Sequence, residues 1–328
     1  MNKYIKWILG AAVLVFVLVF PFIVSKAYHM HIALMIGIHI LLALSLNLVT
    51  GYCGQLSIGH AAFYGVGAYT SALLTLTFPI PFWVAFFIAA IVSAFFGLLL
   101  GLPTLRLKGA YLVISTLGFG EIIRLILLNW IDVTRGPMGI TGIKAPDSIF
   151  GLDFANKTNY YYLMVLIIAI VLILMRLVTN SRTGRAWIAI REDQLAAEVM
   201  GIHLAKYKLI AFVASAFVAG FTGSLYAHYV RFISPDTFVL SESIAVVIMV
   251  LIGGMGTLVG PIIGAIGITY LLEALRDLGQ WRMVLYGLIL FFCAVYLPKG
   301  LMGLYNYALI KIKSKREASV VKANEGGI

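Results

Sequence analysis

Charged residues are scarce in this sequence, and over one long stretch they are absent. Asp, Glu, Lys and Arg make up 11% of the chain, whereas a soluble domain has about 25%. None of these four residue types occurs between Ala27 and Leu105. Because 62% of the residues are hydrophobic, a soluble fold of this composition would leave a large apolar area in water. The scarcity of charge therefore excludes an ordinary soluble domain and indicates a chain that is surrounded by lipid.

The sequence also lacks the patterns of common catalytic and metal centres. Its two cysteines, Cys53 and Cys293, lie in apolar runs, which excludes a disulfide framework. His29, His31 and His39 have no spacing that is typical of metal ligands. There is no Walker-type glycine loop, no Ser–His–Asp order and no pair of catalytic carboxylates. We therefore expect a chain that is not an enzyme, does not hydrolyse ATP and holds neither a metal nor a cofactor.

Two other classes of protein are excluded by the arrangement of residues. Alternation of apolar and polar residues is not the dominant pattern, so an outer-membrane barrel is not expected. The net charge is +11, but the basic residues flank apolar runs, where they set the topology and meet anionic lipid headgroups. We therefore expect contact with membrane lipid and no binding of nucleic acid.

Long apolar runs are what the sequence does have. A helix needs about 20 mostly apolar residues to cross a bilayer, and ten segments approach or exceed that length. The eighth and ninth are short, and we expect either half-helices or re-entrant pieces there. The predicted fold class is all-α, a polytopic integral membrane protein with about 8–10 transmembrane helices. The ten segments are 7–25, 30–50, 56–77, 82–102, 110–128, 159–177, 207–230, 239–253, 260–275 and 282–298.

The distribution of Lys and Arg predicts the orientation in the inner membrane. Basic residues gather at both ends of the chain and in one long polar loop, whereas acidic residues balance the basic ones in the other long loop. Because short basic segments stay inside the cell, both termini are predicted to be cytoplasmic. We predict a transmembrane permease domain over 1–310, with a cytoplasmic loop at about 179–206, an external loop at about 129–158, and a disordered cytoplasmic tail at 311–328.

The cytoplasmic loop contains a short stretch with helix signals. Asp193 is a good N-cap, and Gly201 is a natural end for a helix. Leu195, Val199 and Ile202 are spaced at i, i+4 and i+7, so we expect them on one apolar face. A helix of two turns is unstable alone in water. It therefore needs either the bilayer surface or a groove on a cytoplasmic partner.

This stretch resembles the signature loop of ABC importer permeases, which has Glu-Ala-Ala followed three residues later by Gly. Ala196, Ala197 and Gly201 match that pattern, and Leu195 stands at the Glu position. The branched-chain amino acid permease family has its own variant of the loop, which the sequence resembles closely. The resemblance covers about residues 40 to 300 and is greatest to the LivM-type subunit. It rests on four segments, 44–63 (LSLNLVTGYCGQLSIGHAAF), 183–202 (TGRAWIAIREDQLAAEVMGI), 207–212 (YKLIAF) and 253–261 (GGMGTLVGP).

The resemblance implies an ABC importer permease fold and a heteromeric importer of Leu, Ile and Val. The implied partners are a second, LivH-like permease subunit, two cytoplasmic LivG/LivF-like ATPases that bind ATP and Mg, and a periplasmic substrate-binding protein. The loop helix would then be the coupling helix in an ATPase groove, with the membrane surface as the alternative location. Its charged residues would lie at the rim of the groove, and its small residues would allow close approach. The implied coupling residues are Arg191, Glu192, Asp193, Leu195, Ala196, Ala197, Glu198 and Gly201.

Two glycine-rich breaks are weakly alike, and we interpret them as a possible internal repeat. They read Gly51-x-x-Gly54-x-Leu56-x-x-Gly59 and Gly253-x-x-Gly256-x-Leu258-x-Gly260. Irregular backbone at membrane depth persists only beside a cavity or inside protein. Polar side chains near the first break lie either on a translocation path or in helix–helix contacts. The candidate path residues are Asn47, Gln55, Ser57, His60, Gly253 and Gly256.

Three acidic residues lie within or near the ends of the apolar segments. Glu121 and Arg124 are three residues apart, so we expect a structural ion pair on one helix face, with a proton relay as the alternative. Glu242 and Glu273 lie near segment ends and are expected at the interface. An importer of urea or short amides is the alternative substrate class. A stand-alone secondary transporter or channel is the alternative from another class.

Overall fold

The computed structural model describes residues 15–22, 27–78, 80–148 and 151–276, with a few isolated positions up to 303. Regular structure in this part of the chain is almost entirely helical. Six of its helices are long and apolar enough to cross a membrane, which confirms the predicted all-α, polytopic membrane class. The predicted runs 7–25 and 282–298 lie largely outside the described residues, and the tail 311–328 lies wholly outside, so the total of 8–10 helices stays a prediction.

The helices and strands follow one another with short connections. The six candidate spans are α2 (Ala27–Asn47) with its π-helical turn η1 (Leu48–Tyr52), α4 (Phe82–Thr104), α5 (Ala110–Asn129), α7 (Lys157–Thr179), α10 (Leu204–Val230), and α11 (Leu240–Gly253) with the preceding 3-10 turn η3 (Pro235–Thr237). The shorter elements are α3 (His60–Thr77), α6 (Ile131–Thr134), η2 (Gly136–Met138), β1 (Ile140–Thr141), α8 (Arg182–Glu192), α9 (Gln194–Val199), β2 (Phe232–Ile233) and α12 (Gly260–Ala274).

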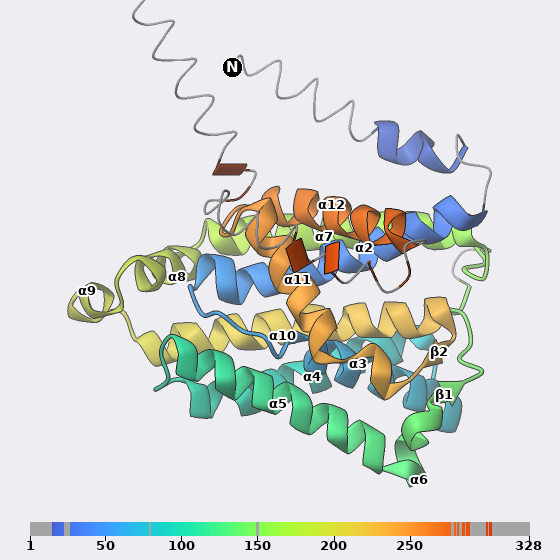
Figure 1. The fold of residues 1–328 in the computed structure, drawn as a ribbon, viewed down its shortest axis with the longest axis horizontal. Helices are drawn as coiled ribbons and strands as arrows, with labels where there is room; N and C mark the ends of the chain where they lie inside the picture. Colours follow the sequence, from blue (N-terminus) through green and yellow to red (C-terminus); the bar gives the residue numbers. More distant parts are fainter. Residues whose placement is uncertain are drawn as a thin grey trace, which may run out of the picture.

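Helix α10 is the centre of the bundle. It contacts α2, α3 and α4 and lies between a layer of α2, α7 and α12 and a layer of α3, α4 and α5 (Figure 1). Small residues allow this close packing. A Cβ added to Gly67 of α3 would collide with the backbone of Gly220 in α10, and one added to Gly223 would collide with the backbone of Tyr64. The small residues of α10 therefore allow its backbone to pack closely against α3.

Helix α3 occupies the third predicted segment, yet it is not among the six apolar candidates. Most of its residues are buried, and it contacts α4, α5, α10 and α11. One of its buried polar residues, Ser71, contacts α10. The Ser71 hydroxyl lies 2.7 Å from the Ser224 hydroxyl and 3.0 Å from Nε2 of His228. Because protein rather than lipid surrounds α3, it tolerates a polarity that a lipid-facing helix does not.

The two long polar loops lie at opposite ends of the bundle (Figure 1). One end carries α8 and α9, and the other carries α6 and the antiparallel pair β1–β2, in which Ile140 pairs with Ile233. The loop at this second end is folded onto the helices, since an Asp147 carboxylate oxygen accepts a 2.7 Å hydrogen bond from the Phe82 amide at the start of α4. Two-residue strands are too short to show a period in the sequence, so they were not predicted.

Candidate functional site

Helices α8 and α9 form a unit with well-defined ends. Asp193 has an extended backbone and separates the two helices. Its carboxylate accepts hydrogen bonds from the amides of Leu195 (2.8 Å) and Ala196 (3.1 Å). Gly201 has a left-handed φ of +80° and follows the last turn of α9, as a helix-ending glycine does. The predicted N-cap at Asp193 and helix end at Gly201 are confirmed.

Three contacts anchor this unit to the helix bundle. The fully buried Trp187 of α8 donates a 2.8 Å hydrogen bond from Nε1 to the Tyr207 carbonyl. Nζ of Lys208 donates a 3.0 Å hydrogen bond to Oε1 of Gln194 at the start of α9. Ala197 is only 3% exposed, so it packs against its own chain. The base of the unit is therefore held to the start of α10.

The outer face of α9 is apolar and uncovered by the described part of the chain. Leu195 is 73% exposed, Val199 82% and Met200 81%. Ile202 instead packs against the core, so the prediction that it shares a face with Leu195 and Val199 is wrong, because the chain turns back at Gly201. The prediction that Ala197 allows close approach to a partner is also wrong, because its side chain points inward. Ala196, Glu192 and Glu198 are exposed.

Arg191, at the end of α8, contacts the first glycine-rich break and lies beside the second. Its Nη1 donates a 2.9 Å hydrogen bond to the Gly51 carbonyl, and its Nη2 donates a 2.7 Å hydrogen bond to Oε1 of Glu192. A Cβ added to Gly54 or to Gly256 would press on the Arg191 side chain. The rim of a partner groove stays a prediction for Arg191. In the structure its guanidinium turns toward the membrane helices, a contact that was not predicted.

Asn47 joins the two breaks to each other. This residue is fully buried at the end of α2. Its Nδ2 donates to the Thr257 carbonyl (2.8 Å), and its Oδ1 accepts from the Gly256 amide (2.9 Å). A Cβ added to Gly51 would collide with Asn47, and one added to Gly253 would collide with the Gly260 backbone. Asn47, Gly253 and Gly256 therefore form a tight junction, which fits a helix contact better than a path lining.

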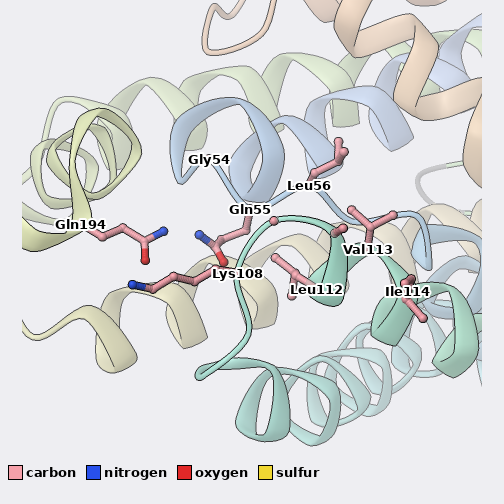
Figure 2. A pocket seen from close by; sticks show the side chains of 10 residues that line it. Gly54, Gln55, Leu56, Lys108, Leu112, Val113, Ile114 and Gln194 are labelled. Atoms are coloured by element: carbon pink, nitrogen blue, oxygen red, sulfur yellow. The ribbon is translucent and has the colours of Figure 1, made fainter.

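The other predicted path residues do not gather in one cavity. The His60 ring hydrogen-bonds the Ser45 hydroxyl through Nε2. Ser57 is 1% exposed, and its hydroxyl has no hydrogen-bond partner among the described residues. Gln55 lines a cavity of about 500 Å³ next to the start of α5. Figure 2 shows the Gln55, Lys108 and Gln194 side chains directed toward one another in this cavity.

Lys108 and Gln194 were not predicted as site residues. Lys108 lies just before an apolar run and Gln194 lies within the long polar loop, and only the fold brings them to the first break. The cavity that they share with Gln55 lies between α9, the chain after Tyr52 and the start of α5. The α8–α9 unit therefore lies next to the helix bundle at this cavity as well as at the Arg191 contact with Gly51.

The fold is that of a multi-pass membrane protein of the permease class. It has predominantly apolar helices, a two-helix unit at one end and glycine-rich breaks between helices within the bundle. The family described as "Branched-chain amino acid transport system / permease component" matches residues 28–294. The chain belongs to this family, as its resemblance predicted.

Relatives with assigned names cover most of the chain. It is 38% identical over 326 residues to the high-affinity branched-chain amino acid transport system permease protein LivM of Salmonella typhimurium, which covers 92% of this chain and 76% of that protein. The LivM protein of Escherichia coli is 38% identical over 314 residues, with 89% and 73% covered. The LivH permease protein of Salmonella typhimurium is 23% identical over 283 residues, with 80% and 90% covered. No solved structure matches the chain.

Proposed function

We propose that this chain is one of two membrane subunits of a binding-protein-dependent ABC importer for leucine, isoleucine and valine. The 38% identity to two LivM proteins over about nine-tenths of the chain supports this substrate class. In the proposed assembly this chain is not catalytic. Two LivG/LivF-like ATPases bind ATP and Mg, a LivH-like permease completes the membrane part, and a periplasmic protein delivers the amino acid. The assembly lies in the inner membrane, with both termini of this chain in the cytoplasm.

The observation that carries the ATP-driven mechanism is the uncovered apolar face of α9. Leu195, Val199 and Met200 are each more than 70% exposed. Helix α9 protrudes at one end of the bundle (Figure 1). Apolar surface in water costs about 25 cal/mol per Å² relative to burial. A groove on an ATPase would remove this cost, in the way that partner grooves receive short amphipathic helices. The membrane surface, the alternative location for this face, becomes the competing outcome in the tests.

The contacts at the base of α9 suggest how motion of the ATPases reaches the membrane helices. Trp187 and Lys208 fasten the unit to α10, and Arg191 fastens it to the carbonyl of Gly51. Asn47 then connects this break to the turn between α11 and α12. ATP binding biases the equilibrium between inward- and outward-facing states, and a rigid unit that touches both interrupted helices transmits that bias.

A reconstituted complex tests the proposal. The chain is purified with its second permease subunit, its ATPases and its binding protein, and ATP hydrolysis and substrate uptake are measured in liposomes. We expect leucine to stimulate both. Stimulation by urea and not by leucine would reverse the substrate class. Uptake by this chain without any ATPase would instead support a stand-alone transporter.

A further inference from the structure

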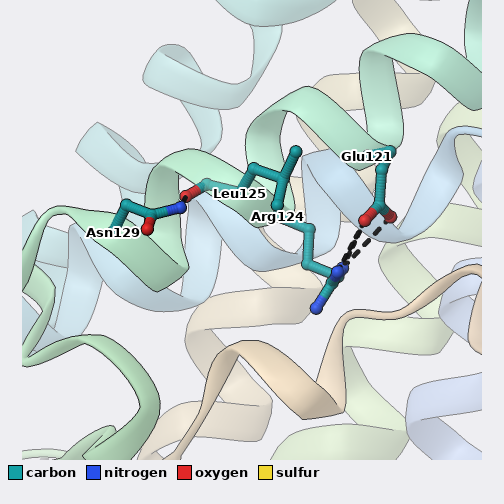
Figure 3. Close-up of polar contacts among 4 residues, drawn as sticks. All are labelled: Glu121, Arg124, Leu125 and Asn129. Carbon is teal, nitrogen blue, oxygen red and sulfur yellow. Dashed lines mark hydrogen bonds and ion pairs between the residues drawn. The ribbon is translucent and has the colours of Figure 1, made fainter.

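Glu121 and Arg124 form an ion pair in the middle of α5. Nε of Arg124 lies 3.0 and 3.1 Å from the two carboxylate oxygens of Glu121, and Nη2 lies 2.6 Å from Oε1 (Figure 3). The predicted pairing is thus confirmed. Nη1 of Arg124 makes no hydrogen bond to another described residue, so one edge of the guanidinium remains available to an acceptor.

The location of this pair is unusual for a transmembrane helix. Helix α5 buries one stripe, formed by Leu112, Thr116, Ile123 and Leu127. Glu121 and Arg124 lie outside this stripe, and their side chains are 43% and 22% exposed. Charged groups within a membrane are costly, and they almost always face a protein interior or a water-filled cavity. A purely lipid-facing location is therefore unfavourable for this pair.

The whole of α5 is poorly covered by its own chain. Over its most apolar 18 residues, 22% are buried, the smallest share among the six candidate spans of the described residues, whereas α2 with its π-turn reaches 78%. The exposed side combines apolar residues, such as Ile114 and Leu125, with Gly118, whose added Cβ would meet no atom within 4 Å. The proposed function requires a second permease subunit, and this face is the least covered among the six candidate spans of the described residues.

A small cavity opens beside Glu121. It has a volume of about 200 Å³ and lies between α3, α5 and the start of α11. Its lining combines Glu121 and Ser243 with apolar residues that include Leu117, Phe238 and Leu240. The Ser243 hydroxyl accepts a 2.8 Å hydrogen bond from the Ala61 amide and keeps its own proton to donate. One water takes about 30 Å³ of liquid volume, so this space holds a small solute. An anionic group, a hydroxyl and apolar walls suit one charged end and an apolar side chain.

We propose that Glu121 and Arg124 bind the charged end of the amino acid on the wall of the translocation path. The Glu121 carboxylate accepts hydrogen bonds from the substrate ammonium, and Arg124 donates to the substrate carboxylate. The apolar side chain of the substrate enters the cavity beside Leu117 and Phe238. The second permease subunit closes the path opposite α5. This inference rests on the proposed function, since it requires an amino acid as the cargo.

The internal pair also explains how such a site can release its cargo. When the site is empty, Glu121 and Arg124 neutralise each other, so no isolated charge remains in a low-dielectric environment. When a zwitterionic amino acid binds, Glu121 gives up part of its contact with Arg124 and binds the substrate ammonium. Arg124 in turn binds the substrate carboxylate. Transport needs binding that is favourable enough to admit a solute and weak enough to let it leave. A site that competes with its own ion pair meets both requirements.

The decisive variant exchanges the two charges, Glu121→Arg with Arg124→Glu. The exchanged residues still pair at i and i+3, so a structural or lipid-facing pair would be preserved. The complete importer with its binding protein is reconstituted in liposomes, and leucine uptake is measured. We expect uptake to fall about tenfold or more, because the charges face the wrong ends of the substrate. Uptake equal to that of the unmodified importer would overturn the inference.

Further variants separate loss of the site from loss of the fold. Each variant is first tested for assembly with the second permease subunit and the ATPases by size-exclusion chromatography. If the exchanged pair fails to assemble, Glu121→Gln, which keeps the side-chain volume, is used with the same expected loss and the same overturning result. Glu273→Gln is the matched control, since it removes an i,i+3 pair between Glu273 in α12 and Arg276 just beyond the end of that helix (3.0 Å), and uptake should be unchanged.

The same assay distinguishes this inference from the proposed function. If the unmodified importer moves leucine and the exchanged pair moves it equally well, only the inference about α5 is wrong. If the unmodified importer moves urea and not leucine, both the proposed function and the zwitterion site are overturned.

Discussion

The guanidinium of Arg191 donates a 2.9 Å hydrogen bond to the carbonyl oxygen of Gly51. One partner belongs to the two-helix unit α8–α9 at the end of the bundle, and the other belongs to the π-helical turn η1 that follows α2. An added Cβ at Gly256 would collide with the same guanidinium, so the second break lies beside it as well. Arg191 is therefore the place where displacement of α8 and α9 would act on both interrupted helices.

Replacement of Arg191 by Ala should uncouple ATP hydrolysis from transport. The exposed face of α9 stays intact, so the ATPases should still bind, but the contact with Gly51 is lost. A hydrogen bond to a charged group contributes about 1.5–3 kcal/mol, so leucine uptake per ATP hydrolysed should fall roughly tenfold. Arg182→Ala, at the exposed start of α8, is the control. An unchanged ratio of uptake to hydrolysis in Arg191→Ala would show that this contact carries no motion.

Replacement of Leu195 by Glu should prevent ATPase binding while leaving the membrane helices folded. The side chain is 73% exposed and belongs to the apolar face proposed to enter the ATPase groove. A carboxylate in that groove would be buried without a partner, which costs several kcal/mol. Co-purification of the ATPases in mild detergent is the measurement. Leu152→Glu, which changes a 52% exposed leucine in the loop before α7, should have no effect. Retention of the ATPases by Leu195→Glu would favour a helix that lies on the membrane.

Replacement of Asn47 by Leu should destabilise the junction between the breaks. The Gly256 amide and the Thr257 carbonyl would lose their partner in a partly buried environment, where an unpaired group costs about 1 kcal/mol. The melting temperature in detergent should therefore fall. Asn129→Ala removes an exposed amide-to-carbonyl bond at the end of α5 and should change it little. If Asn47 instead lines the path, the substitution would alter uptake and leave the melting temperature unchanged.

Cysteine labelling should determine which end of the bundle faces the cytoplasm. In a Cys293→Ser background, Val199→Cys should react with a membrane-impermeant maleimide only in inside-out vesicles, and Leu152→Cys only in intact spheroplasts. The native Cys53 should not interfere, because it is fully buried and burial raises the pKa of its thiol to about 12. Maleimides react with the thiolate, which is scarce at neutral pH when the pKa is so high. Labelling of Val199→Cys from outside spheroplasts would contradict the proposed orientation.

Local features could be predicted from the sequence because neighbouring residues determine them. The cap at Asp193, the left-handed turn at Gly201 and the pairing of Glu121 with Arg124 each involve residues no more than three positions apart. The apolar runs located the long helices for the same reason. Such signals require no knowledge of the fold.

Features that depend on the fold were missed or misplaced. The inward direction of Ala197 and Ile202 follows from how α9 docks on α10, and a helical wheel does not contain that information. The contact of Arg191 with Gly51 joins segments far apart in the chain. Charge alone suggested a surface location for Arg191, whereas the packing of glycine backbones admits its side chain to the bundle.

The polarity of α3 has a consequence for biogenesis. A helix that carries Ser71, Tyr64 and Tyr69 among its buried residues partitions poorly into lipid when it is alone, because insertion depends on the apolar character of each segment. The Ser71 hydroxyl finds its partners, Ser224 and His228, on α10, which is synthesised much later. During synthesis α3 must therefore remain shielded by the adjacent α2 and α4, or by the insertion machinery, until the second half of the chain arrives.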